Sequence, residues 1–354
     1  MARPAAGPAR PAEDLSSRSL HILELLVESY IATGEPVGSR TLARSHGLDV
    51  SPATVRNEMM DLEEAGFLAH PYTSAGRVPT EHAFRWFVEL RSGNYTLSRS
   101  DRQSLDALTA SAEGGIQDCL RETSRVLSRL SGCPGMALAP TLEDAVFQHV
   151  DFVRLRPAEL LVIFVSSAGL IVNRVVRLDE DVPQAQLSRL AALLCERLTG
   201  APLSEIRGRL LDELAHDRAL ADDLSRRVVE ITRLVFQQEL EGAVFVSGTS
   251  NLLGHPEFTE PDRIRSLFEA LEDRERIVNI LDRARVAGGI CVSIGADAGI
   301  DGVDDLVVVS SSYRCGTSAL GSIGIIGPTR LDYSRVIPMV EHAAKLISRF
   351  LDVR

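Results

Sequence analysis

Four polar side chains in the stretch 51–57 have the chemistry of nucleic-acid contacts. Ser51, Thr54, Arg56 and Asn57 supply hydroxyl, guanidinium and amide groups, which bind base edges in the major groove and phosphate oxygens. Ser51 is suited to cap a helix, and Pro52 fits the first helical position, where its missing N–H is not needed. The stretch therefore predicts a helix whose first turn directs free N–H groups and polar side chains at DNA.

Two further groups of residues flank this stretch. Arg40 and Arg44 lie one helical turn apart before it, and we expect them to bind phosphates, because arginine is suited to phosphate contacts. Thr73, Ser74 and Arg77 follow it in a glycine-containing turn. We expect these three to contact DNA from a hairpin, with Arg77 at its tip.

The apolar pattern around these residues predicts a winged helix-turn-helix domain over residues 15–95. An apolar stripe at helical spacing begins at Leu20, and Gly34 ends that helix. A short helix, a four-residue turn and a helix from Pro52 follow, which is the order of a helix-turn-helix. After Gly66, two short strands form a hairpin, or wing, and one more helix closes the domain. The first helix is expected to start after a cap at Ser16 or Ser17 and to end at Thr33; the other expected helices are 41–46, 52–65 and 81–91, and the expected strands are 67–69 and 77–78.

The charge pattern supports DNA as a partner locally but not globally. The net charge of −11 argues mildly against nucleic acid. Residues 36–57, however, carry three arginines against one acid, Asp49, and the other acids lie on the first helix and on the far half of the helix from Pro52. The face expected to meet DNA is thus neutral to basic. Because winged helices also serve as protein-interaction modules, that alternative stays open.

The rest of the chain predicts an α+β arrangement. Residues 1–14 are rich in Ala, Pro and Arg without periodicity, and we expect a disordered tail. The β-rich runs at 146–178 and 289–326 are expected to share one sheet, with the mainly helical block between them as an insertion. The expected helices of this part are 105–130, 183–198, 203–240, 261–285 and 331–351, with a short strand at 243–246.

Enzyme chemistry finds little support in the sequence. The glycines of 321–327 lack the GxGxxG order, the acids of 301–305 lack a calcium-loop pattern, and the serines 310–312 lack a GxSxG context. The five cysteines form no metal-ligand spacing. We therefore predict no catalytic, cofactor or metal site and no enzyme. A membrane span and a signal peptide are not expected either, which makes the cytoplasm the default location.

Several longer motifs resemble one known family. They are GEPVGSRTLA at 34–43, SPATVRNEMMDLEEAGFL at 51–68, HPYTSAGRVPTEHAFRWFV at 70–88, VSGTSNLL with PEF within 246–258, and SIGIIGPTRLDYSRVI at 322–337. These blocks are similar to those of the heat-inducible transcription repressor HrcA family, and they span nearly the whole chain after the tail. The departures are small: Ala83 stands where the family often has glycine and Leu331 where it often has methionine.

The resemblance implies a repressor of bacterial chaperone operons. Such proteins bind an inverted-repeat operator, the CIRCE element, as homodimers, and their activity depends on the chaperonin GroEL, which heat diverts to unfolded clients. It also implies a winged-helix domain at 15–95 and a GAF-like domain in two parts, 96–202 and 286–354, separated by a dimerising insert at 203–285. The repressor would act in the cytoplasm, on the nucleoid when bound to its operator.

Three questions stay open at this stage. The apolar residues Val228, Ile231, Leu234 and Val235 could line the dimer surface or an internal core, because a sequence does not separate the two kinds of burial. Heat could act through instability of the repressor itself or through titration of the chaperonin. The alternative function is a winged-helix regulator that senses a small molecule in the GAF-like pocket.

Overall fold

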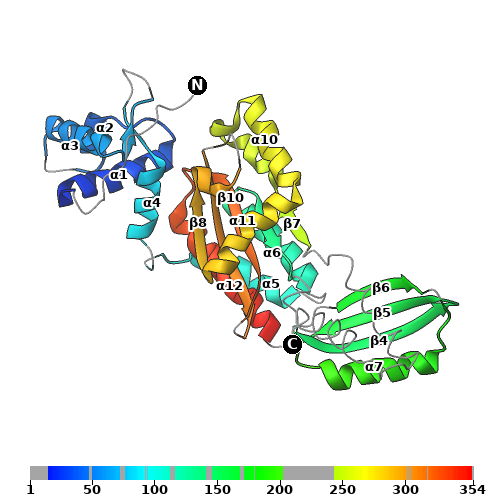
Figure 1. Cartoon of the computed structure of the whole chain (residues 1–354). Coiled ribbons are helices and arrows are strands. Elements are labelled where there is room, and N and C mark those ends of the chain that lie inside the picture. The colour runs from blue at the N-terminus through cyan, green and yellow to red at the C-terminus, as the bar shows by residue number, and fades with distance from the viewer. Residues whose placement is uncertain are drawn as a thin grey trace, which may run out of the picture.

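The computed structural model places a winged-helix domain, a central body and a smaller sheet-and-helix unit in a row (Figure 1). It describes residues 15–352 except for a set of gaps. The gaps are 48–49, 72–75, 92, 94, 112–115, 141–145, 168–170, 179, 202–242, 301–302, 304 and 317. The predicted tail at 1–14 and the part of the predicted insert up to residue 242, including Val228, Ile231, Leu234 and Val235, lie outside the described residues.

The first domain has the predicted winged-helix order. Its elements are α1 (Ser17–Thr33), α2 (Ser39–Ser45), α3 (Pro52–Glu64), β1 (Leu68–Ala69), β2 (Val78–Pro79) and α4 (Glu81–Leu90). One apolar face from each helix meets in a common core, with Leu26, Leu42, Val55 and Leu62 fully buried. Val55, Met59 and Leu62, spaced at helical intervals, are buried and form the inner face of α3.

The body is built on a five-stranded antiparallel sheet with the order β7-β3-β10-β9-β8. Its strands are β3 (Gly135–Leu138), β7 (Val244–Ser247), β8 (Ile290–Ile294), β9 (Leu306–Cys315) and β10 (Ser318–Pro328). Along β9 and β10 the chain alternates between two buried faces, so both faces need a cover of helices. The α+β class expected from the sequence is confirmed.

Helices cover both faces of that sheet (Figure 1). On one side pack α5 (Arg99–Ser111), α6 (Ile116–Ser131) and α12 (Tyr333–Asp352), and on the other α10 (Pro261–Glu272) and α11 (Arg274–Ala287). Short 3-10 turns, η2 (Thr249–Gly254), η3 (Pro256–Phe258) and η4 (Gly295–Ala298), join these elements. The predicted helix at 105–130 is therefore two helices, α5 and α6.

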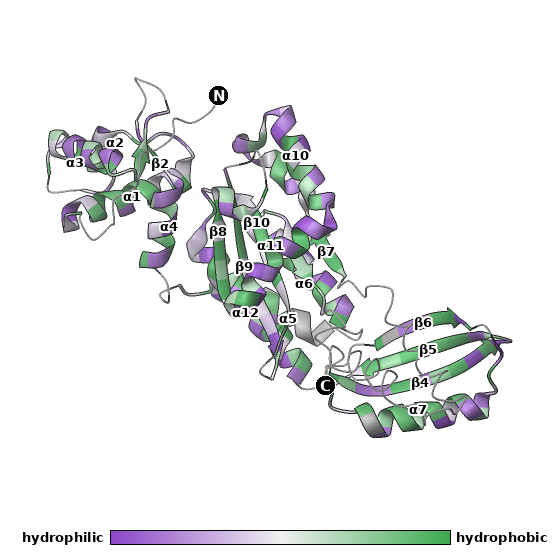
Figure 2. Cartoon of the chain, in the orientation of Figure 1, coloured by the Kyte–Doolittle hydropathy of each residue, from purple (hydrophilic) through white to green (hydrophobic). Residues whose placement is uncertain are grey.

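A separate three-stranded sheet forms the third unit. It is a meander of β4 (Phe147–Arg156), β5 (Glu159–Ser166) and β6 (Ile171–Arg177), followed by α7 (Gln184–Leu198). Buried residues of the sheet, such as Phe152 and Phe164, alternate with more exposed ones along the strands, so α7 covers one face only. Figure 2 shows how rich these strands are in apolar residues.

The expectation that 146–178 and 289–326 share one sheet is wrong. Among the described residues, the strands of 146–178 pair with one another, and β10 pairs with β9 and with β3, a strand that the apolar pattern did not predict. β3 is a short Gly-Met-Ala-Leu strand buried on both faces, so it shows no apolar alternation. Residues 244–285 also belong to the body, since β7 pairs with β3, α11 packs on the sheet and α10 packs on α11. Among the described residues, the inserted unit is therefore 146–201.

Candidate DNA-binding surface

The second helix of the helix-turn-helix, α3, begins as predicted at a serine cap. The Ser51 hydroxyl accepts a hydrogen bond from the Thr54 amide at 3.1 Å and lies 3.0 Å from the Thr54 hydroxyl. This contact satisfies one of the free N–H groups of the first turn. Ser51 remains exposed and Thr54 is half-buried, so both side chains stay at the surface of the helix N-terminus.

The outer face of α3 carries the predicted base-reading groups. Arg56 and Asn57 are exposed, and they lie opposite the buried Val55 and Met59. The same face continues to Met60, whose side chain is 45% exposed. Met60 was not among the predicted contacts, although its place four residues after Arg56 puts it on the same face of the helix. A methionine there can contact the methyl group of thymine.

Two arginines of α2 flank this face. Arg40 and Arg44 are both exposed, and no carboxylate of the described residues lies within ion-pair distance of Arg40, Arg44 or Arg56. A guanidinium without an acidic partner is available to a phosphate oxygen, because no existing ion pair has to break. The structure thus brings the predicted phosphate contacts to the helix pair that also carries Arg56.

Two of the four acids of α3, Glu58 and Glu63, are engaged by neighbouring side chains. Glu58 accepts a hydrogen bond from the Ser19 hydroxyl at 2.6 Å and lies 3.7 Å from Arg18, which ties α3 to α1. Glu63 pairs with Arg77 at 2.7 Å. These contacts neutralise negative charge near the surface that faces DNA in the predicted arrangement.

Arg77 does not lie at the tip of the wing, so that expectation is wrong. Its side chain is 14% exposed, and its guanidinium contacts Glu63 of α3 and His70, at 2.7 and 3.0 Å. Its backbone exchanges two hydrogen bonds with Val37, of 2.8 and 2.9 Å. Arg77 therefore holds the base of the wing to the helix pair. Nothing in its sequence neighbourhood points to Glu63, which comes from a different element.

A glycine makes the base of the wing possible. A Cβ atom at Gly76 would stand 2.4 Å from the Val37 carbonyl carbon and 2.5 Å from its oxygen, closer than any side chain can approach. Only glycine lets the returning strand pair with Val37. The other two predicted wing contacts, Thr73 and Ser74, lie outside the described residues.

The cap of α3 leads to a first prediction. Replacing Ser51 by alanine should lower the free energy of unfolding by about 1 kcal/mol, because the Thr54 amide loses its acceptor. Replacing Ser51 by aspartate keeps an acceptor at the cap and should preserve stability. Because it places a negative charge beside the DNA phosphates, it should weaken duplex binding. Urea unfolding and duplex binding of both variants check this. Equal stability of the two variants would contradict the cap assignment.

A cavity of about 500 Å³ lies where the winged-helix domain meets the body, lined by Glu24, Leu90, Arg91, Tyr95, Thr96 and Ser334. Burial raises the pKa of Tyr95 to about 12, so its hydroxyl stays a donor at neutral pH. The cavity is at the junction, whereas the ligand-sensing alternative expects one inside the GAF-like domain.

Within the described ranges, no cluster of three His, Cys, Asp or Glu residues suits a metal ion, and no helix is long and apolar enough to cross a membrane.

Similarity to known proteins agrees with this geometry. The family model described as the HrcA protein C-terminal domain matches residues 117–337, which is more than half of the chain. The chain belongs to the HrcA family. The resemblance expected from the sequence motifs is thereby confirmed, and so is the role of a heat-inducible transcription repressor that this family name states.

Individual HrcA relatives match over nearly their full length. The heat-inducible transcription repressor HrcA of Syntrophobacter fumaroxidans is 41% identical over 341 residues, covering 96% of this chain and 98% of the relative. The HrcA of Geobacter sulfurreducens is 40% identical and covers 96% and 99%. A crystal structure described only as a hypothetical protein shares the fold, with a TM-score of 0.64 at 22% identity and coverage of 96% and 99%.

Proposed function

We propose that this HrcA-family repressor binds an inverted-repeat operator of the CIRCE type through α3 and represses heat-shock operons. The observation that carries the proposal is the exposed N-terminal half of α3, with Arg56 and Asn57 outward and with Arg40 and Arg44 beside it. Ser51 and Thr54 add hydroxyls at the helix start, and Thr73 and Ser74 remain predicted wing contacts. A repressor acts by binding rather than by chemistry, so we propose no enzymatic activity.

We also propose that the repressor acts as a homodimer. The face of the three-stranded sheet opposite α7 is apolar, and its valine and isoleucine side chains are unusually exposed: 59% for Ile171, 59% for Val175 and 37% for Val153. Val175 lies across from Leu161, which pairs in turn with Val153, so the three form one row. A second copy of the chain would bury this row, and two-fold symmetry matches the symmetry of an inverted repeat.

The proposed regulation rests on the family resemblance. We infer that GroEL supports the active repressor in the bacterial cytoplasm and that heat relieves repression by diverting GroEL to unfolded clients. Loss of operator binding on heating in the absence of GroEL, restored by adding GroEL after cooling, is the expected result. Instability of the repressor alone would instead give a loss that GroEL does not reverse.

Fluorescence anisotropy of the full-length protein tests the proposed function. Binding to a labelled inverted-repeat CIRCE duplex is compared with a scrambled duplex over a salt series, with and without GroEL. Tighter binding to the inverted repeat, with an affinity that falls as salt rises, is expected because phosphate contacts release counterions. Weak and equal binding to both duplexes would favour the protein-interaction role of the winged helix.

Two arginine variants separate base reading from phosphate binding. Replacing Arg56 by alanine should cost about 1–3 kcal/mol on the operator and relax specificity at one base position. Replacing Arg40 by alanine should weaken binding to all sequences alike and reduce the salt slope by about one unit. Each variant is the control for the other, measured on the same panel of single-base operator changes. A change of sequence preference in R40A with an unchanged slope would reverse the two roles.

A further inference from the structure

The winged-helix domain contacts the body through a joint, which we define by Gly34 and Phe84 on the domain and by Glu257, Arg330 and Tyr333 on the body. At its centre, the rings of Phe84 and Tyr333 pack with their centroids 6.2 Å apart. These two side chains are only 2% and 1% exposed. A buried aromatic contact between two domains resists rotation of one against the other, because any rotation exposes apolar surface.

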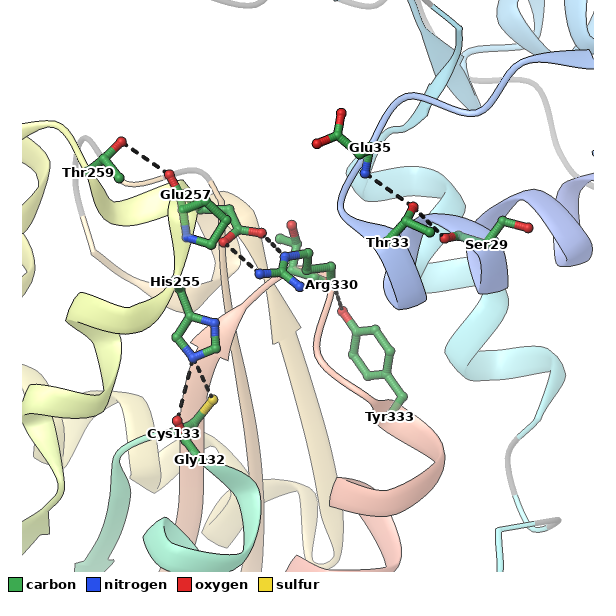
Figure 3. Close-up of polar contacts among 12 residues, drawn as sticks. Ser29, Thr33, Glu35, Gly132, Cys133, His255, Glu257, Thr259, Arg330 and Tyr333 are labelled. Carbon is green, nitrogen blue, oxygen red and sulfur yellow. Dashed lines mark hydrogen bonds and ion pairs between the residues drawn. The ribbon is translucent and has the colours of Figure 1, made fainter. Parts of the chain in front are cut away.

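Arg330 extends the joint to the end of α1. It donates to Glu257 through Nε and through Nη2, the latter at 3.3 Å, and the two side chains are 21% and 15% exposed. The guanidinium lies against Gly34, where a Cβ atom would stand 3.4 Å from its Nε and 3.6 Å from its Cζ. Figure 3 shows Arg330 between the body segment that carries Glu257 and the end of α1. A cation there also faces the negative end of the helix dipole.

A second contact holds the domain through the residue next to Phe84 on α4. Arg85 of α4 forms an ion pair with Asp297 at 2.9 Å and donates to the Ile294 carbonyl oxygen at 3.3 Å. Ile294 is the last residue of β8, and Asp297 lies in the turn η4 that follows it. Because Arg85 and Asp297 are partly exposed, the pair contributes little stability, but it adds a second point at which the domain is held.

The joint also accounts for two sequence motifs that DNA contact leaves unexplained. The block PEF supplies Glu257, and the block IGPTRLDY supplies Arg330 and Tyr333. The two blocks lie far apart in the sequence and on different elements, η3 and the β10–α12 connection, yet they meet against the domain that carries α3. Their side chains are therefore placed to set how that domain is oriented on the body.

We propose that this joint sets the half-site spacing that the repressor accepts, by holding α3 at a fixed orientation relative to the dimer. The inference rests on the proposed binding of an inverted repeat by a homodimer. Two recognition helices held rigidly fit half-sites at one separation and one rotation along the DNA helix. Recognition helices on flexible tethers can bind half-sites at several separations. The effective concentration of the second helix at its half-site is then lower for each of these separations.

The test uses full-length protein with Arg330 replaced by methionine (R330M) and, as a milder change, Glu257 replaced by glutamine (E257Q). Anisotropy titrations cover a single half-site, the native inverted repeat, and repeats whose spacer is shortened or lengthened by one or two base pairs. For the unaltered protein we expect a sharp optimum at the native spacer. In both variants the preference for the native spacer over a two-base-pair change should fall about tenfold, with half-site affinity unchanged.

A matched control removes an arginine contact inside the body. Arg314 donates to the Gly288 carbonyl oxygen at 2.7 Å. It lies at the end of β9 opposite the joint, because Arg314 pairs with Ala319 whereas Leu306, at the other end, pairs with Pro328. R314M should leave the spacing profile unaltered. A DNA-free readout is trypsin cleavage after the exposed Arg99, in the segment that follows the winged-helix domain. Cleavage should be faster in R330M than in R314M under native conditions, because a loosened joint frees this segment.

The outcomes separate this inference from the proposed function. If the unaltered protein does not prefer the inverted repeat to a scrambled duplex, the proposed function fails, and the inference fails with it. If it does prefer the repeat, but R330M and E257Q keep the sharp spacing optimum and are cleaved no faster than R314M, the proposed function stands and only the inference about the joint is wrong. If R330M bound the operator more tightly and kept the native spacing optimum, the inference about the joint would also be overturned. The joint would then weaken DNA binding and not set the half-site spacing.

Discussion

Replacing Val175 by glutamate (V175E) is expected to split the proposed dimer and to lower operator affinity about 100-fold or more. Val175 lies on the open face of the three-stranded sheet, in the row with Leu161 and Val153. Two-fold packing of this face brings the new carboxylates of both copies into an apolar contact, where each loses water without gaining a partner. A monomer then reads one half-site and loses the gain from binding two at once.

Sedimentation equilibrium and anisotropy measure the two effects. The matched control is Val286→Glu, because Val286 is a valine of α11 that is 86% exposed and lies on the body, away from this sheet. V286E should remain dimeric and bind as the unaltered protein does. A dimeric V175E would refute the assignment of this face. Loss of stability in V175E, with the same molar mass in solution as the unaltered protein, would show that this face is buried within one chain and not between two copies.

Replacing Gly76 by alanine (G76A) should detach the wing from the helix pair and sharply weaken DNA binding. The added methyl group would stand 2.4 Å from the Val37 carbonyl carbon, so the strand must move away and lose its paired hydrogen bonds with Val37. We expect a cost of about 2–3 kcal/mol in the winged-helix domain, the range for overpacking at a backbone contact. The ion pair of Arg77 with Glu63 would be displaced as well.

Gly254→Ala is the control for a glycine substitution as such. A Cβ atom at Gly254 would meet nothing within 4 Å, so this variant should keep both stability and operator affinity. Urea unfolding followed by amide hydrogen exchange of residues 37 and 77 locates the damage in G76A. We expect its dimer to persist, because the three-stranded sheet is unaffected. Unchanged exchange at Val37 and Arg77 would show that the wing tolerates the methyl group.

Much of the winged-helix domain was predictable because its signals are local. Helix caps such as Ser51, helix ends such as Gly34 and the apolar stripe of α3 all act within one or two turns of the chain, and the structure confirms them. The exposed positions of Arg40, Arg44 and Arg56 follow from the same periodicity. The family could be recognised for a similar reason, since its motifs are continuous stretches of sequence.

Contacts between distant segments were not predictable in the same way. Whether Arg77 meets DNA or Glu63 depends on where β2 and α3 are brought together, and periodicity carries no information about that. The sheet assignment was wrong for a related reason: strand pairing is chosen among all strands of the chain, and β3 gave no alternation by which to include it.

Local sequence signals were enough to predict the helix-turn-helix with its wing, the polar face of α3 and the membership of the HrcA family. The fold was needed to show that the strands of 147–177 form a sheet of their own with exposed apolar residues on one face, and that Glu257, Arg330 and Tyr333 meet the winged-helix domain. These two kinds of feature differ in the sequence distance over which they act. Caps and periodicity depend on neighbours along the chain, whereas sheet pairing and domain contacts depend on residues that only the fold brings together.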